Sequence, residues 1–377
     1  MTSGRTRILL DARKARDFGI GTYIRGLLGG LATLQRFDVH ALVLPGEERL
    51  IPPGVSASVC SARHYSFAEL VAVRRAISRL DPDVFHAPHY VVPFFPPRAT
   101  VVTIHDLMHL SRPEHATAVK RAYARWMIGR ALRLSARVIA VSEATRKEIL
   151  AFGPAQGGKV VVIPNGARED FLECEEQKGE GRSGDTLRSP GALSPVPPFK
   201  ENLSSSSSSS PYLLFLGNDK PHKNLDGLLA AWPRVFAAHP DLSLVLAGVA
   251  PGRAAGAPGV RALGFVPDAD VPPLVAGARI LVQPSFAEGF GLPVIEAQAA
   301  GTPVACSDIP ALREAAGDAA MFFDPHDVAS IADTLNVLIG DQEKRRLLGK
   351  GGRERAAAFT WRAVAERTAA VYEDAIS

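Results

Sequence analysis

Short runs of apolar residues alternate with longer segments of helical periodicity along this chain, and the whole alternation occurs twice. In the first half, apolar runs rich in β-branched residues predict strands over residues 7–10, 39–44, 84–87, 100–104 and 137–141. Between them, the periodicity predicts helices over residues 23–34, 67–80 and 115–134. Apolar strands joined by helices are typical of a parallel sheet that is covered on both faces.

The same alternation starts again near residue 211. Here the predicted helices include residues 225–239 and 292–300, and strands are expected over residues 212–216, 243–247, 261–263, 280–283, 302–305 and 320–323. Two parallel α/β units joined end to end bring the carboxyl ends of their strands, where ligands bind in such sheets, to one cleft. The sequence therefore predicts an α/β protein of two Rossmann-like domains that face a central cleft.

The segment between the two halves has a different composition. It is charged, then rich in proline, and it ends in seven consecutive serines. Such a composition cannot bury enough apolar surface to fold, so we expect a disordered linker. The predicted boundaries are residues 1–170 for the N-terminal domain, 171–210 for the linker, 211–360 for the C-terminal domain and 361–377 for an amphipathic helix that packs back on the N-terminal domain.

Charge and cysteine content exclude several classes of function. Lysine and arginine exceed aspartate and glutamate by 43 − 39 = 4 over 377 residues, which is too small an excess to indicate nucleic-acid binding. Cys60, Cys174 and Cys306 are odd in number and far apart, so they indicate neither a disulfide framework nor a zinc site. Because no apolar run reaches the roughly 18 residues of a membrane span, we expect a soluble, cytoplasmic protein. The inner face of the membrane is left open as a further location.

Two glycine-rich segments fail the requirements of known nucleotide-binding motifs. The segment from Gly19 through Gly21 to Ile24 lacks the third small residue of a dinucleotide fingerprint, because Ile24 is β-branched. Its glycines fit either the approach of an anion to a helix N-terminus or a tight turn alone. A second segment ends in Lys159 and Val160, where a Walker A motif requires Ser or Thr after the lysine.

Two pairs of aspartates resemble metal ligands in spacing alone. Asp81 and Asp83 flank an apolar strand, and Asp268 and Asp270 precede an apolar segment. Residues in such places usually form turns or helix caps. We therefore expect no metal at either pair.

The most informative segment runs from residue 284 to residue 304. A predicted strand ends before it, a glycine-rich turn follows, and Pro293 has its φ angle preset for the first turn of a helix. Glu288 then lies on the turn and Glu296 one turn inside the helix. Backbone N–H groups at this helix start can bind an anion, and the two carboxylates can accept hydrogen bonds from hydroxyls. The segment indicates a ligand that combines phosphate with a polyol, cradled by the backbone of Phe290, Gly291 and Leu292.

This segment resembles the E-x7-E signature of retaining GT-B glycosyltransferases, and the rest of the chain is similar to glycosyltransferase family 4. The family's landmarks occur in order and cover nearly the whole chain outside the serine-rich segment. They are Gly19-Ile-Gly-Thr-Tyr23, Thr103-Ile-His-Asp106, Val141-Ser-Glu143, Ile163-Pro-Asn-Gly166, the run from Gly217 to Asn224, Leu246-Ala-Gly248 and Gly264-Phe-Val266. Single pieces are weak signals, but their common order is specific.

The resemblance implies a role for each candidate residue. It implies that the sugar nucleotide lies mainly on the C-terminal domain, with the acceptor on the N-terminal domain. The catalytic residues would be His105 near the donor sugar, Glu288 on the sugar hydroxyls and Lys223 on the diphosphate. Many relatives carry an arginine where this chain has Asn218, so Lys220 or His222 would supply the second cation. The remaining donor-binding residues would be Gly19 and Gly21 over the diphosphate, Val266 at the nucleobase and Glu296 at the ribose.

The resemblance also implies the reaction. It suggests a retaining, metal-independent hexosyltransferase without cofactor, in which the departing diphosphate takes the acceptor's proton during a front-face substitution. The first expectation is mannose transfer from GDP-mannose to a saccharide or a lipid-linked acceptor in cell-surface polysaccharide synthesis. A UDP- or dTDP-sugar donor is one alternative. A sugar-nucleotide epimerase and a non-catalytic binding subunit are two others.

A basic run that covers the third predicted helix and ends at the strand after it suggests one further partner. It consists of Lys120, Arg121, Arg125, Arg130, Arg133 and Arg137, with Trp126 and Met127 among them. Such a run can contact an anionic membrane that carries a lipid-linked acceptor. At 100° per residue the charges spread around the helix instead of forming one face, which favours an ordinary solvated surface.

Overall fold

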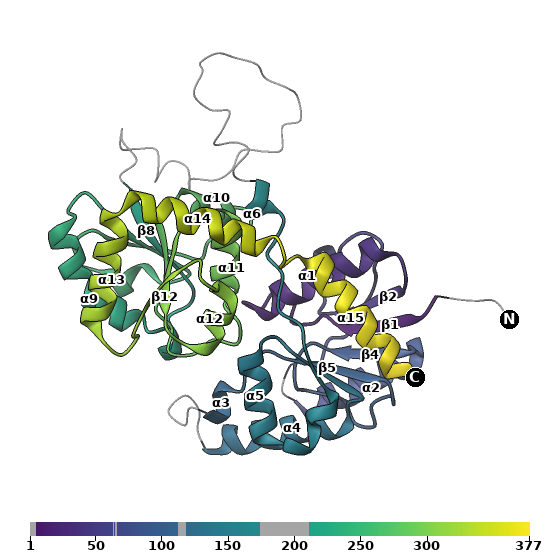
Figure 1. The fold of residues 1–377 in the computed structure, drawn as a ribbon. Helices are drawn as coiled ribbons and strands as arrows, with labels where there is room; N and C mark the ends of the chain where they lie inside the picture. Colours follow the sequence, from purple (N-terminus) through teal and green to yellow (C-terminus); the bar gives the residue numbers. More distant parts are fainter. Residues whose placement is uncertain (1–4, 63, 65, 112–117, 174–210) are drawn as a thin grey trace, which may run out of the picture.

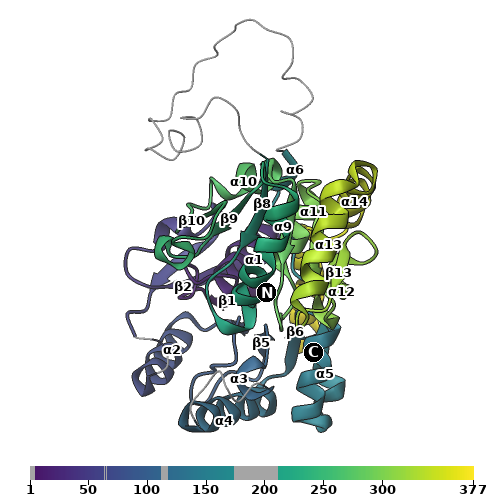
Figure 2. The same ribbon diagram turned by 90° about the vertical axis from the view of Figure 1, so that its left-hand side faces the viewer.

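The computed structural model describes residues 5–62, 64, 66–111, 118–173 and 211–377, which form two α/β domains (Figure 1). Cys174, the serine tract and the predicted start of the third helix lie outside the described residues. Figures 1 and 2 show the domains side by side, with the helix α5 (Glu143–Phe152) of the first next to α12 (Pro310–Ala316) of the second.

The N-terminal domain is built on a parallel sheet with strand order β3-β2-β1-β4-β5-β6-β7 in the described part of the chain. Its strands are β1 (Arg7–Asp11), β2 (Asp38–Val43), β3 (Ser56–Val59), β4 (Val84–Ala87), β5 (Thr100–Ile104), β6 (Arg137–Ala140) and β7 (Val160–Val162). The covering helices, besides α5, are α1 (Ile20–Leu34), α2 (Phe67–Leu80), α3 (Met108–Ser111) and α4 (Ala118–Leu134).

The C-terminal domain has a second parallel sheet, with strand order β10-β9-β8-β11-β12-β13. Its strands are β8 (Tyr212–Leu216), β9 (Ser243–Ala247), β10 (Val260–Gly264), β11 (Ile280–Gln283), β12 (Val304–Ser307) and β13 (Met321–Phe323). The helices besides α12 are α9 (Leu225–Ala238), α10 (Val271–Gly277), α11 (Leu292–Ala299), α13 (Val328–Gly340) and α14 (Gln342–Ala356).

The sequence pattern predicted buried strands correctly but missed an exposed one. Every residue of β5 and β11 is buried, and both strands were predicted with their observed bounds. The edge strand β3 has no buried residue and was not predicted, because its sequence SASV lacks the apolar character of the others. The predicted strand at 302–305 is displaced to β12, since Thr302 and Pro303 form the turn before it.

Side-chain caps fix where several helices begin. The Ser142 hydroxyl accepts a hydrogen bond from Thr145 N at 3.0 Å at the start of α5. Asn224 and Thr360 cap α9 and the last helix, α15 (Trp361–Ile376), in the same manner. These caps fix the first turn of each helix.

The last helix returns to the N-terminal domain, where it packs along α1 (Figure 1). The Trp361 indole covers Gly26, where an added Cβ would lie 2.1 Å from the ring. Tyr372 at the far end of α15 is fully buried in the same core as Tyr23. The chain thus ends in the domain in which it began.

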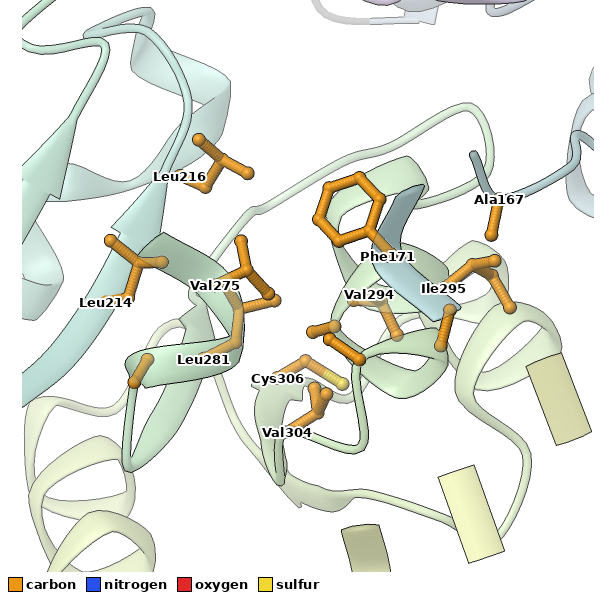
Figure 3. Close-up of a cluster of buried hydrophobic side chains, with 14 of the residues drawn as sticks. Ala167, Phe171, Leu214, Leu216, Val275, Leu281, Val294, Ile295, Val304 and Cys306 are labelled. Carbon is orange, nitrogen blue, oxygen red and sulfur yellow. The ribbon is translucent and has the colours of Figure 1, made fainter. Parts of the chain in front are cut away.

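The predicted linker begins too early, at residue 171. Residues 171–173 belong to the short helix α6 (Asp170–Glu173), and Phe171 is fully buried near Val294 and Ile295 of α11 in the core of the C-terminal domain (Figure 3). The sequence did not indicate this helix because Phe171 stands among charged residues. Residues 174–210 lie outside the described part.

Candidate active site

The loop after β11 lies against the end of β5 in the other domain. A Cβ added to Gly289 would lie 2.0 Å from the carbonyl oxygen of His105, so a side chain there would force the two segments apart. Both strands are buried, which fixes the loops at their carboxyl ends. The contact brings Glu288 of one domain and His105 of the other to the same place.

Glu288 is held by three donors that converge on one oxygen. Its Oε1 accepts from Lys223 Nζ at 2.8 Å, Gln283 Nε2 at 2.7 Å and Ser285 Oγ at 2.7 Å. Burial by itself would raise the pKa of Glu288, but the Lys223 ammonium and the hydrogen bonds lower it below its usual value. Glu288 is therefore ionised, and within the described residues no donor contacts its Oε2.

Lys223 reaches Glu288 from a neighbouring turn. It ends the 3-10 helix η4 (Pro221–Lys223), which follows β8. The carbonyl of His222 accepts from Phe286 N at 2.8 Å, so this turn is tied to the loop after β11. Lys223 thus forms an ion pair with Glu288 at the site. An ammonium group has three hydrogens, so it can also donate to a ligand.

Asn218 and Lys220 lie on the same turn. The Oδ1 atom of Asn218 is buried and has no hydrogen-bond partner among the described residues, whereas Lys220 is exposed. Buried amide oxygens are usually paired, so Asn218 is a polar group that a ligand would satisfy.

Glu296 lies on α11, and its buried carboxyl has fewer donors and less positive charge around it than that of Glu288. Its side chain is 9% exposed, and Arg168 Nε lies 3.9 Å from its Oε1. Burial raises the pKa of Glu296 to about 7, since Arg168 offsets only part of the penalty while Asp170 and Asp268 add to it. Near neutral pH this carboxyl is therefore partly protonated.

His105 leaves the end of β5 as predicted. Its Nε2 lies 3.0 Å from the carbonyl oxygen of Pro88, which can only accept, so Nε2 carries the proton and Nδ1 is an acceptor. Burial lowers the pKa of His105 to about 4 and keeps the ring neutral. Asp106 accepts from Met108 N at 3.1 Å and so caps the start of α3.

A buried chain of hydrogen bonds lies behind His105, and sequence reasoning missed it. Tyr23 packs edge-on against the His105 ring at 4.9 Å between ring centroids, and its hydroxyl lies 2.9 Å from Thr103 Oγ1. His86 joins Thr103 at 2.8 Å to the Tyr372 hydroxyl at 2.7 Å. The last helix thus supports His105 from a distance of more than 250 positions in the sequence.

The first turn of α1 also faces the C-terminal domain. Gly19 adopts a φ of 73° at the helix N-cap, and a Cβ on Gly21 would lie 2.5 Å from the carbonyl oxygen of Ala15. One turn further, Arg25 pairs with Asp268 at 2.7 Å across the domains. Asp268 thus contributes a salt bridge between the two domains.

The three predicted cradle residues differ in what they expose. Phe290 is 2% exposed and belongs to the domain core, so only its backbone can contact a ligand. Gly291 has a φ of 117°, which permits the turn into Leu292, the first residue of α11. Val266 is likewise buried and can contribute only backbone groups to a nucleobase pocket.

Two hydroxyls of α5 contact the loop after β11, and sequence reasoning did not assign them to the site. Ser142 Oγ donates to the carbonyl oxygen of Gly289 at 2.6 Å. Thr145 Oγ1 lies 3.2 Å from that oxygen and 3.2 Å from the carbonyl oxygen of His105. Only the family landmark at Ser142 could have pointed to them.

A second buried cluster could be taken for a metal site. One ligand atom from each of Asp11, Glu69 and His89 lies within 4.8 Å of the others. However, the Arg13 guanidinium already donates to Asp11 at 2.6 Å and to Glu69 at 2.9 Å. The arginine supplies the positive charge at this cluster, so a cation would have to displace it.

A basic groove at the opposite, amino end of β11 is separate from these residues. It is lined by Arg279, Arg345, Arg346, Lys350 and Arg353, among others. Arg279 and Arg345 both donate to the carbonyl of Ile339 at the end of α13. Two of the groove's cations thus stabilise a helix C-terminus.

The two parallel sheets, in contact through the loops at their carboxyl ends, define a class of fold, the two-domain GT-B type. A sequence profile for "Glycosyltransferase Family 4" matches residues 19–171, and one for "Glycosyl transferases group 1" matches residues 199–355. The O-antigen chain mannosyltransferase B of Escherichia coli is 30% identical over 77% of this chain and 74% of its own length. The chain therefore belongs to glycosyltransferase family 4.

Other comparisons agree with the assignment. Phosphatidyl-myo-inositol mannosyltransferase of Mycobacterium leprae is 30% identical over 62% of this chain and 58% of its own length. The structure of sucrose-phosphate synthase from Thermosynechococcus elongatus has a TM-score of 0.75 at 20% identity, over 98% of both chains. The predicted fold class is thereby confirmed.

Proposed function

We propose that this chain transfers a hexose from a sugar nucleotide to a saccharide or a lipid-linked acceptor in cell-surface polysaccharide synthesis. Mannose from GDP-mannose is the first choice of donor, because two relatives are named as mannosyltransferases. The observation that carries the proposal is the ionised Glu288–Lys223 pair, placed beside His105 by the contact of Gly289 with the other domain.

In this proposal the donor lies across the loop after β11. Glu288 Oε2 accepts a hydrogen bond from a sugar hydroxyl. The Lys223 ammonium and the backbone N–H groups at the start of α11 donate hydrogen bonds to the diphosphate. Lys220 is exposed on the adjoining turn and supplies the second cation. Glu296 accepts hydrogen bonds from the ribose hydroxyls, which would add to its pairing with Arg168 at 3.9 Å.

The chemistry we propose is a retaining, front-face substitution. The bond between the anomeric carbon and the diphosphate oxygen breaks, the acceptor oxygen bonds to that carbon from the same side, and its proton passes to the departing diphosphate. Lys223 and backbone N–H groups stabilise the developing negative charge, so the mechanism requires neither a metal nor a cofactor. His105 is neutral and offers Nδ1 as an acceptor to a sugar hydroxyl.

A lipid-linked acceptor would bring a cytoplasmic enzyme to the inner face of the membrane. Among the described residues, every helix is too short or too polar to span a bilayer. In the basic run, Arg130 donates to the carbonyls of Val92 and Pro93, and Arg137 pairs with Asp374, so these two are used within the fold. Flotation with anionic liposomes at low salt tests for contact by the rest.

A thermal-shift panel of GDP-, UDP- and dTDP-sugars tests the donor. A ligand at 100 times its dissociation constant should stabilise the protein by about 2.7 kcal/mol. We expect GDP-mannose to give the largest shift and Glu296→Ala to reduce it. A larger shift with a UDP- or dTDP-sugar would replace GDP-mannose as donor, and isomerisation of the donor without acceptor would favour an epimerase.

A further inference from the structure

The start of α5 forms a connection between the two domains next to the reacting groups. The Ser142 and Thr145 side chains belong to the N-terminal domain, and both approach the carbonyl oxygen of Gly289 in the other. Their exposed fractions are 0% and 2%. Water cannot easily reach groups this deeply buried. Loss of these hydrogen bonds would therefore leave the carbonyl oxygen unpaired and cost free energy.

The two carbonyl oxygens at this connection can only accept hydrogen bonds. Those of Gly289 and His105 come from different domains, and both lie 3.2 Å from Thr145 Oγ1. Without hydroxyl hydrogens between them, two carbonyl dipoles would oppose each other in a buried place. The hydroxyls of Thr145 and Ser142 therefore supply the hydrogen-bond donors that allow the two backbone segments to approach each other.

A carboxylate of the C-terminal domain adds a second contact at the start of α5. Glu314 of α12 accepts from Glu143 N at 2.9 Å and 2.8 Å with its two oxygens. It thus binds the N-terminus of α5, where backbone N–H groups and the helix dipole favour a negative charge. Figures 1 and 2 show α5 and α12 next to each other where the domains meet.

We propose that Ser142 and Thr145 are positioning residues for glycosyl transfer. Their hydroxyls hold the Gly289 carbonyl beside that of His105, and this fixes Glu288, one residue away, relative to the His105 ring. The proposal rests on the proposed function for its effect on turnover. Its structural part, that these hydroxyls join the domains, stands independently of the substrate.

Thr145→Val is the discriminating variant, because it keeps the shape of the side chain and removes the hydroxyl. Thr145→Ser retains the hydroxyl and should rescue. The matched control is Thr100→Val: Thr100 is fully buried and donates to Pro97 at 2.7 Å within a single domain. We expect Thr145→Val to lower kcat about 10-fold with a small change in donor KM, as for one lost buried hydrogen bond.

Small-angle scattering separates positioning from simple loss of stability. Thr145→Val should increase the radius of gyration of the folded protein without ligand, while Thr100→Val and Thr145→Ser match the wild type. Equal compactness of Thr145→Val and wild type, or equal activity loss in Thr145→Val and Thr100→Val, would overturn the proposal. If the wild type turned over no sugar nucleotide, the proposed function would fail, and scattering would still decide whether Thr145 joins the domains.

Discussion

Glu296 gives the clearest prediction for a single residue. Burial raises its pKa from 4.5 to about 7, so between these values the folded chain holds a proton that the unfolded chain has released. The free energy of unfolding that this group contributes therefore falls as the pH rises from 4.5 to 7, and it is constant above 7. Glu296→Gln has no proton to lose. Relative to wild type, the variant should gain up to about 3 kcal/mol between pH 5 and pH 8.

Urea denaturation of both proteins at pH 5 and pH 8 measures this difference. An exposed glutamate substituted in the same way, Glu354→Gln, serves as control and should show no such gain. A stability difference between Glu296→Gln and wild type that is independent of pH would show that Glu296 stays ionised in the folded protein.

Single residues also show what a sequence can reveal about a site. Glu288 and His105 could be proposed because their motifs follow the carboxyl ends of strands, and Glu296 because it lies one turn inside the helix after Glu288. That Lys223 pairs with Glu288 could not, since 65 positions separate them and only the fold brings them to 2.8 Å. The raised pKa of Glu296 depends in the same way on charges from other elements.

The packing of α15 on α1 gives a prediction for an element. A Cβ on Gly30 would lie 2.5 Å from the carbonyl oxygen of Trp361, whereas one on the adjacent Gly29 would meet no atom within 4 Å. Gly30→Ala should destabilise the protein by about 1–3 kcal/mol through overpacking. Gly29→Ala should stabilise it by about 0.5–1 kcal/mol through helix propensity.

Thermal unfolding of the two variants beside wild type checks the contact. The comparison is sharp because the substitution and the helix are the same in both. Equal unfolding temperatures for Gly29→Ala and Gly30→Ala would mean that α15 does not lie on this face of α1.

Elements were predictable where their residues are buried in a regular pattern. The periodicity of α2 and of α15 predicted their observed bounds, since one face of each packs on a core. The exposed strand β3 and the short helix α6 have no such pattern. Their positions follow from pairing with β2 and from the burial of Phe171, which are tertiary effects.

At the scale of the molecule, the candidate site lies where the two domains touch, and the last helix returns to the N-terminal domain. Repetition of the α/β pattern predicted two sheets, but not which surfaces touch. The contacts of Gly289 with His105 and of Arg25 with Asp268 depend on the relative placement of the domains. We therefore expect the reaction at the contact between the domains, with the donor held by the C-terminal domain.

The most direct test of glycosyl transfer follows the release of nucleoside diphosphate from GDP-mannose with a panel of saccharide acceptors. Wild type, Glu288→Ala and Lys223→Ala are compared after circular dichroism has shown that all are folded. We expect turnover by the wild type, a product with the anomeric configuration of the donor, and a loss of at least about 100-fold in both variants. Near wild-type rates in either variant would contradict this expectation.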